Sequence, residues 1–354
     1  RRSVVTAGRA AEERFDWLKF QLKRRTGRLG PIEVLPYRGH GTPEALFMKG
    51  RVLEKKGITR SSANDTVGTN LRNMVRRFAS TEIPFAHVRA RFGKHELEMV
   101  ADEEGFFDLR FELAAPLSAT TAWHPVEVEL LWPKEKGAGA QATGSVLVPM
   151  GARFGVISDL DDTVVRSRAT SFFKMVPITL LNNAHTRLPF EGVASFYRAL
   201  QRGGGGREFN PIFYVSSSPW NLYDLLEDFL DVHGVPAGPL FLKDWSPTTV
   251  RDRDKHKLGV IRTLLATYPE LPFVLIGDSG EKDPEIYYKV VREHPGRIRA
   301  IYIRDGTTED RGATVRAIAH EVRSLGVEMM LVPDTTTAAE HAAQNDLIPA
   351  EYHP

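Results

Sequence analysis

The chain after Met150 alternates buried strand-like runs with helical segments, and this alternation limits the possible folds more than any other feature. Near-continuous apolar runs are typical of parallel strands covered on both faces, and they occur at FGVISD, PIFYVSSS, PFVLIGDS and AIYIRD. Helical segments such as VASFYRALQ, WNLYDLLEDFL and KLGVIRTLLATY lie between them, and a further helix and a final strand are predicted in TVRAIAHEVRSLGVEMMLVPD. Since crossovers between parallel strands are right-handed, the pattern predicts an α/β fold with an open, doubly wound parallel sheet.

The first half of the chain has a different pattern. Helical spacing from Ala7 to Lys23 predicts an N-terminal helix, which the glycines of RTGRLG end. Short strand-like pieces follow, several of them alternating in polarity, and one short helix is predicted near LRNMVRRFAS. HELEMVAD and FFDLRFEL are separated only by Glu103, Glu104 and Gly105, which predicts a hairpin. This half is therefore predicted to be a smaller antiparallel β-sandwich, or a small barrel, preceding the parallel sheet.

Length and composition fit two globular domains, which we place at residues 1–150 and 151–354. A chain of 354 residues exceeds what one hydrophobic core usually serves, and 42% hydrophobic residues can fill two cores. The net charge of +2, from 47 basic and 45 acidic residues, lacks the one-sided basic field of a dedicated nucleic-acid binder. We therefore expect no nucleic acid among the partners.

Cysteine usage excludes several kinds of chemistry, and hydropathy bears on the expected cellular location. The chain has no cysteine, which excludes disulfides, thiolate nucleophiles and cysteine metal sites. No apolar window approaches the roughly 18 residues of a membrane-spanning helix, and RRSVVTAGRAAEERFDWLKF lacks the apolar centre of a signal peptide. A cytoplasmic location is the expectation. The chain does not begin with Met, so whether a segment precedes it stays open.

Polar side chains follow three of the predicted parallel strands at their carboxyl ends, where open α/β sheets bind ligands. These side chains are Asp159, Asp161 and Thr163 after FGVIS; Ser216, Ser217 and Ser218 after IFYV; and Asp278 and Asp283 after FVLIG. The stretch Lys255-His256-Lys257 precedes the helix before the third of these strands. We expect carboxylates, hydroxyls and an ammonium group to meet at one edge of the sheet.

These groups suit phosphoryl transfer from a phosphomonoester. One carboxylate can attack phosphorus and form an acyl phosphate, while a second carboxylic acid protonates the leaving oxygen and later deprotonates the attacking water. A hard divalent cation held by carboxylates, for which Mg²⁺ is the expectation, reduces the repulsion between the two anions. Lysine and hydroxyl donors can hold the remaining phosphate oxygens.

The motifs and their order also resemble a known family. Asp159-Leu160-Asp161-Asp162-Thr163 matches the DxDxT signature of haloacid-dehalogenase-like (HAD-like) phosphatases, and the serine, lysine and GDSGEKD elements follow in that superfamily's order. Within it, DLDDTV, SSSPWNLYDLL, GPLFLKDW, HKLGVIRTLL and IGDSGEKDPEIY resemble a bacterial member of the actin-patch-type phosphatidate phosphatase family, which is related to the lipins. The resemblance covers about residues 154–305, and the PYRGHGTP and ARFGVISD flanks of the preceding half also resemble bacterial members.

The resemblance implies a role for each matching residue. Asp159 is expected to be the nucleophile and Asp161 the general acid and base, with Thr163 positioning the loop. Ser216 is expected to bind a phosphoryl oxygen, and Lys257 to neutralise the phosphate and the nucleophile.

The same resemblance implies a Mg²⁺ site built from Asp159, Asp161, Asp278 and Asp283, the last as a direct ligand or as support for one. Lys255 remains an alternative for the lysine role. Lys257 is preferred because it directly abuts the apolar part of its helix.

Structural explanations exist for each of these features taken alone. The aspartates after FGVIS could cap a helix, as could the serines before Pro219 and the acids of GDSGEKD. A calcium loop fits poorly, because Val164 and Thr170 stand where glycine and glutamate are needed. The lysines could be solvated surface groups. Four elements in the right order at corresponding strand or helix ends favour the catalytic interpretation.

The expected function is Mg²⁺-dependent hydrolysis of phosphatidate to diacylglycerol and phosphate, with the substrate implied by the resemblance alone. The alternatives are a phosphatase of a soluble phosphomonoester and a non-catalytic scaffold with a phosphatase-like domain. Phe172 and Phe173 lie in an apolar segment after the first motif, which could form a lip for lipid or simply fold over the core. Peripheral contact with a membrane surface is accordingly a hypothesis. Trp220 and Tyr223 are expected in the core, and Arg304 is not assigned to the site.

Overall fold

The computed structural model describes residues 30–55, 81–118, 121–133, 140–160, 192–243, 253–305 and 309–352. They form two compact units, one ending at Met150 and one beginning at Gly151. The predicted N-terminal helix, the predicted short helix near residues 71–80, Asp161, Thr163 and the apolar segment with Phe172 and Phe173 lie outside the described residues.

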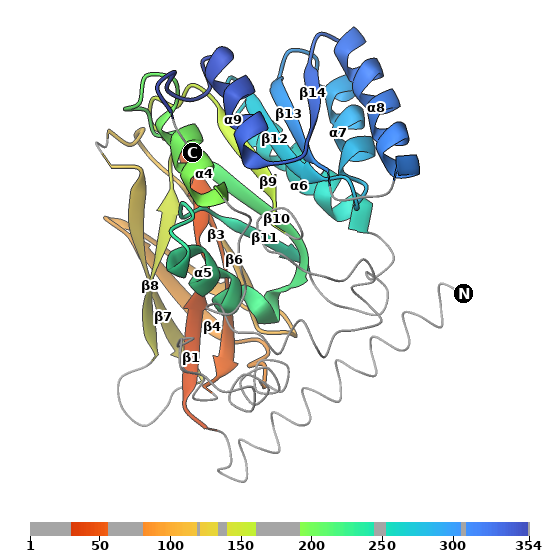
Figure 1. The fold of residues 1–354 in the computed structure, drawn as a ribbon. Helices are drawn as coiled ribbons and strands as arrows, with labels where there is room; N and C mark the ends of the chain where they lie inside the picture. Colours follow the sequence, from red (N-terminus) through yellow and green to blue (C-terminus); the bar gives the residue numbers. More distant parts are fainter. Residues whose placement is uncertain are drawn as a thin grey trace. The chain divides into compact units, whose positions relative to one another are not determined.

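The first unit is one eight-stranded sheet (Figure 1). Its strands are β1 (Ile32–Pro36), β2 (Gly39–Gly41), β3 (Ala45–Glu54), β4 (His87–Phe92), β5 (His95–Val100), β6 (Phe106–Glu112), β7 (Trp123–Trp132) and β8 (Gln141–Leu147). The hydrogen-bonded order is β1-β3-β2-β8-β7-β4-β5, and β6 pairs with β3. Neighbouring strands run antiparallel except β2 and β8, which run parallel. Where an antiparallel sandwich or small barrel was predicted, the strands thus form one mixed sheet, because β2 and β8 run parallel.

Alternate side chains of these strands pack into one core. In β4 and β7 the residues Val88, Ala90, Val126 and Val128 are buried, while the intervening positions are partly or fully exposed. This is the two-residue period expected of a sheet with one covered face.

The predicted hairpin between residues 95–102 and 106–113 is wrong. The chain does turn there: the Asp102 N–H donates to the Phe106 carbonyl at 2.8 Å, and Gly105 has a φ of 78°. However, β5 pairs with β4, and β6 pairs with β3 along its whole length. The Val52 N–H donates to the Gly105 carbonyl at 2.8 Å, so the turn delivers the chain to β3. A local pattern identifies a turn, but non-local packing decides which strand is the partner.

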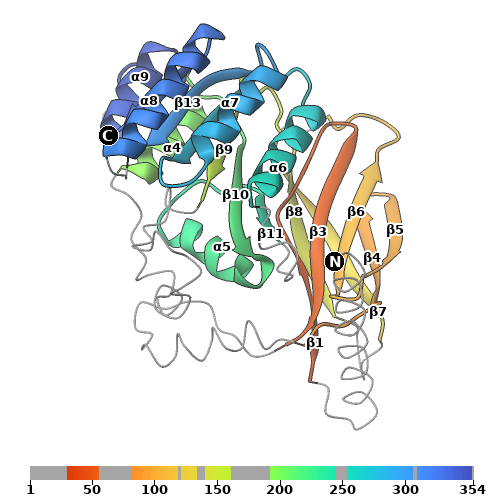
Figure 2. The same cartoon turned by 90° about the vertical axis from the view of Figure 1, so that its right-hand side faces the viewer.

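The second unit is built on a six-stranded sheet in the order β11-β10-β9-β12-β13-β14 (Figures 1 and 2). Its strands are β9 (Gly155–Asp159), β10 (Ile212–Pro219), β11 (Leu240–Lys243), β12 (Phe273–Asp278), β13 (Ile298–Arg304) and β14 (Glu328–Val332). All neighbouring pairs run parallel. The helical elements are α4 (Val193–Arg202), the 3₁₀ turn η1 (Trp220–Leu222), α5 (Tyr223–Val232), α6 (Arg253–Thr267), α7 (Asp283–Glu293), α8 (Glu309–Ser324) and α9 (Thr335–Gln344). The predicted parallel sheet and its alternation with helices are confirmed.

Helices cover both faces of this sheet. Side chains of α6, α7 and α8 pack with Ile157, Leu275 and Ile301 in one core. On the opposite face, α4 places Tyr197 against Tyr214 of β10, with ring centroids 6.4 Å apart, and Phe196 against Tyr302 of β13. Because successive side chains of a strand point to opposite faces, the two sets belong to different layers. The near-continuous apolar runs of the sequence reflect this double coverage.

Candidate active site

The parallel sheet brings the predicted polar residues to its carboxyl edge. Asp159 is the last residue of β9, which lies between β10 and β12. Val215 is its partner in register on β10, so Ser216 lies one position further along. Asp278 ends β12 opposite Arg304, which ends β13.

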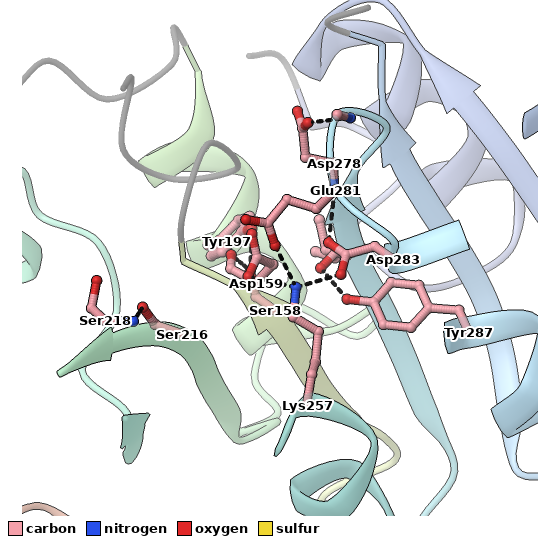
Figure 3. A network of polar contacts seen from close by, with 12 residues as sticks. Ser158, Asp159, Tyr197, Ser216, Ser218, Lys257, Asp278, Glu281, Asp283 and Tyr287 are labelled. Carbon is pink, nitrogen blue, oxygen red and sulfur yellow. Dashed lines mark hydrogen bonds and ion pairs between the residues drawn. The ribbon is translucent and has the colours of Figure 1, made fainter. Parts of the chain in front are cut away.

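Lys257 of α6 lies at the centre of a carboxylate cluster at this edge (Figure 3). Its side-chain Nζ lies 2.9 Å from Asp159 Oδ1 and 3.2 Å from Glu281 Oε2, and it donates to Asp283 Oδ1. The residue is 4% exposed. Lys255, the alternative lysine, is exposed on the same helix. Of the two candidates, the structure therefore brings Lys257 to the predicted nucleophile.

Opposing electrostatic effects act on this cluster. Burial favours the neutral amine of Lys257, but the charges of Asp159, Asp283 and Glu281 outweigh it and raise the pKa well above its usual value. Burial raises the pKa of Asp283, and Glu281 adds to this effect, while Lys257 opposes it. The ammonium is thus charged at neutral pH, and it compensates the buried carboxylates of Asp159 and Asp283.

The β12–α7 loop positions Asp278 and Asp283 differently. The Asp283 carboxylate accepts the Asp278 N–H at 3.0 Å and so faces inward. A Cβ on Gly277 would lie 2.4 Å from that carboxylate, which explains the glycine before Asp278. The Asp278 carboxylate accepts the Gly280 N–H at 2.6 Å and lies 3.5 Å from an Arg304 nitrogen. Figure 3 shows it pointing away from Lys257.

Arg311 of α8 holds the backbone of the same loop. Its guanidinium donates to the carbonyls of Ser279 and Glu281 at 2.8 and 2.6 Å. It also donates to both carboxylate oxygens of Glu285 at 2.5 and 2.9 Å. Such a bidentate pair fixes the guanidinium plane. A second anchor is the ion pair between Lys282 and Asp254 of α6, at 2.8 Å.

Buried hydroxyls brace the strand end that carries Asp159. Ser158 Oγ donates to the Asp159 carbonyl and lies 2.7 Å from the Tyr197 hydroxyl. Because Ser158 uses its proton on that carbonyl, Tyr197 is the donor to Ser158. Burial raises the pKa of Tyr197, which keeps the phenol protonated for this role.

The structure buries three further residues that were singled out in the sequence: Ser216, Trp220 and Tyr223. Ser216 is buried in β10, and its Oγ accepts the Ser218 N–H at 2.9 Å. Figure 3 shows the two serines apart from the Lys257 cluster. Trp220 and Tyr223 are buried and stacked on each other, as expected.

Sequence reasoning missed three contributors to the site: Glu281, Arg304 and Arg311. Glu281 could have been found, because it lies inside GDSGEKD between two assigned acids. The only sequence signal for Arg304 is its position directly after a strand, which is too little to assign it to the site. Arg311 carried no local signal, since its contacts lie at least 26 residues away in the chain.

Asp159, Glu281 and Asp283 form a group that could hold a metal ion, with ligand oxygens within 4.8 Å of one another. Carboxylate oxygens are the donors that hard divalent cations prefer, so the donor set fits such an ion. Two of the predicted metal ligands, Asp159 and Asp283, belong to the group. Asp278 ends the neighbouring strand, and Asp161 lies outside the described residues.

Among the residues that the structure describes, no helix is long and apolar enough to cross a membrane.

Comparison with known proteins gives a match that coincides with this site. Residues 154–305 match the family described as "Phosphatidate phosphatase APP1, catalytic domain". Phosphatidate phosphatase APP1 of Saccharomyces cerevisiae is 32% identical over 154 residues, which are 42% of this chain and 25% of that protein. An uncharacterised protein of Schizosaccharomyces pombe is 29% identical over 164 residues, which are 45% of this chain and 26% of that protein. The match thus spans about a quarter of each fungal relative.

Among solved structures, a carbohydrate acetylesterase from Xanthomonas citri is 14% identical, with a TM-score of 0.28. That comparison covers 80% of this chain and 72% of the other. Similarity at this level does not bear on function.

Proposed function

We propose that this chain belongs to the APP1-type phosphatidate phosphatases and that residues 151–354 are a HAD-like, Mg²⁺-dependent catalytic domain. The observation that carries the proposal is the buried ion pair between Asp159 and Lys257 at the carboxyl edge of the parallel sheet. It lies inside the segment that matches the phosphatidate phosphatase catalytic domain. A buried carboxylate paired with a charged lysine is poised for nucleophilic attack on an anionic substrate.

The proposed reaction has two steps. An Asp159 carboxylate oxygen forms a bond to phosphorus while the bond from phosphorus to the ester oxygen breaks, and Asp161 gives that oxygen a proton. A water molecule then attacks the phosphorus of the acyl phosphate and loses a proton to Asp161. The bond between phosphorus and Asp159 breaks, and inorganic phosphate is released. With phosphatidate the other product is diacylglycerol.

The remaining residues bind and orient the substrate in this proposal. Lys257 pairs with the phosphoryl group, Ser216 donates to one of its oxygens, and Thr163 positions the loop that carries Asp161. Asp159, Asp161, Asp278 and Asp283 would hold Mg²⁺. When bound, Mg²⁺ neutralises phosphate charge and so lowers the repulsion of the nucleophile.

The substrate class also suggests a location. Phosphatidate resides in a bilayer, so the proposed substrate requires peripheral contact with a membrane surface by a protein that we expect in the cytoplasm.

Phosphate release from phosphatidate in mixed micelles, with and without Mg²⁺, tests the proposal in wild type and Asp159→Asn. We expect Mg²⁺-dependent release that the substitution abolishes, with the far-UV circular dichroism spectrum unchanged. Release from water-soluble phosphate esters alone would remove the lipid assignment but keep the chemistry. No release from either substrate by a folded protein would favour the scaffold interpretation.

A further inference from the structure

Three carboxylates already surround the Lys257 ammonium. It donates hydrogen bonds to Glu281 and Asp283, and it forms an ion pair with Asp159 Oδ1 at 2.9 Å. Because an ammonium group has only three N–H donors, a phosphoryl oxygen that binds Lys257 competes with these carboxylates.

The three carboxylates are not equally able to leave. The side chains of Asp159 and Asp283 are 0% exposed, whereas that of Glu281 is 24% exposed. Asp159 ends a central strand, and Asp283 also accepts the Asp278 N–H. Among the described residues Glu281 forms no ion pair besides that with Lys257. A displaced Glu281 carboxylate can turn toward solvent, whereas the carboxylates of Asp159 and Asp283 are buried.

Glu281 can leave without any movement of its backbone. Arg311 donates to the Glu281 carbonyl at 2.6 Å, and the next residue, Lys282, is paired with Asp254. Rotation of the side chain alone breaks the contact to Lys257.

We propose that the Glu281 carboxylate occupies on Lys257 the place of a substrate phosphoryl oxygen and that the phosphoryl group of the substrate displaces it. The inference rests on the proposed function, because it assumes that Lys257 binds the phosphoryl group.

The same displacement predicts which class of phosphate ester binds better. A singly charged phosphodiester offers Lys257 no more charge than Glu281 does, whereas the dianion of a phosphomonoester does. Glu281 is thus a specificity-determining residue that favours monoesters.

Binding of inorganic phosphate tests this without any turnover. Isothermal titration of the Mg²⁺-loaded protein compares wild type, Glu281→Gln and Glu281→Ala at one fixed ionic strength. Because ion pairs of partly exposed groups are modest, we expect phosphate to bind about two- to fivefold more tightly to both variants. Glu293→Gln is the control: it removes a partly exposed carboxylate that pairs with Arg262, away from Lys257 and the β12–α7 loop, and its phosphate affinity should stay at the wild-type value.

A parallel titration with Mg²⁺ alone separates displacement from metal binding by Glu281. Displacement predicts wild-type Mg²⁺ affinity in Glu281→Gln. Weaker Mg²⁺ binding by about tenfold or more, together with weaker phosphate binding, would overturn the inference and make Glu281 a metal ligand. Unchanged phosphate affinity in both variants, or equal tightening in Glu293→Gln, would overturn it as well. Tighter phosphate binding by a protein that does not hydrolyse phosphatidate would support the inference while refuting the proposed substrate.

Discussion

At the scale of single residues, the site depends on one buried cation facing several acids. Burying an ion is costly unless its partners are well placed, and removing one partner leaves uncompensated charge. Lys257 is the ammonium that compensates Asp159 and Asp283, both of which are buried. The same contacts that hold the proposed nucleophile in place therefore also stabilise the fold.

Replacing Lys257 by Met should lower both the stability of the fold and the phosphatase activity. We expect a loss of about 3 to 5 kcal/mol in the free energy of unfolding at pH 7.5, because buried carboxylates lose their counter-ion. Phosphatase activity should become undetectable. Urea unfolding and phosphate release measure the two effects.

Lys255→Met provides the comparison for this prediction. This lysine is exposed on the same helix, so its replacement should change stability by less than about 0.5 kcal/mol and retain activity. Activity lost in Lys255→Met but kept in Lys257→Met would reverse the assignment of the lysine.

At the scale of elements, the β12–α7 loop carries most of the site, and α8 holds its backbone. Arg311 reaches two loop carbonyls and Glu285. It touches none of the carboxylates of the cluster itself, so we regard it as a positioning residue.

Replacing Arg311 by Met should lower kcat about tenfold with little change in KM, and weaken Mg²⁺ binding by about the same factor, as losses of supporting contacts around metal ligands do. Arg311→Lys should recover only part of the loss, because lysine lacks the planar fork. Steady-state kinetics measures kcat and KM of each variant, and a Mg²⁺ titration measures its affinity for the ion.

A matched control is Arg262→Met. Arg262 makes a similar bidentate pair with Glu293, at 2.8 and 2.7 Å, but contacts no carbonyl of the loop. Equal losses in the Arg262 and Arg311 variants would show that Arg311 acts through general stability alone.

At the scale of the whole molecule, the chain holds two units with separate hydrophobic cores. Among the described residues, the acidic cluster that could hold a metal lies in the second unit. Mg²⁺ binding should therefore stabilise that unit, by about 2.7 kcal/mol at a hundredfold excess over Kd.

Hydrogen exchange with Mg²⁺ and with EDTA can locate this effect. We expect slower exchange in β9, β12 and α6 when Mg²⁺ is present, and no change in β3 and β7. Protection that rises equally in both units, or only in the first, would contradict the placement of the metal site.

Local patterns in the sequence predicted the parallel sheet and its polar edge, because buried strands have continuous apolar runs and ligand groups follow their carboxyl ends. They could not predict contacts made across the fold. The partner of β6 depends on packing against β3, and the direction of the Asp278 carboxylate depends on Gly280 and Arg304. The support by Arg311 likewise appears only when α8 lies beside the loop.

The central claim is that Asp159 becomes covalently phosphorylated by phosphatidate. The most direct test is a rapid acid quench of the Mg²⁺-loaded protein with phosphatidate labelled in its phosphate, followed by peptide mass spectrometry. We predict label on the peptide that contains Asp159, formed and lost within a turnover and absent from Asp159→Asn. Steady hydrolysis of phosphatidate with no label on the protein at any quench time, or label on another residue, would contradict the account.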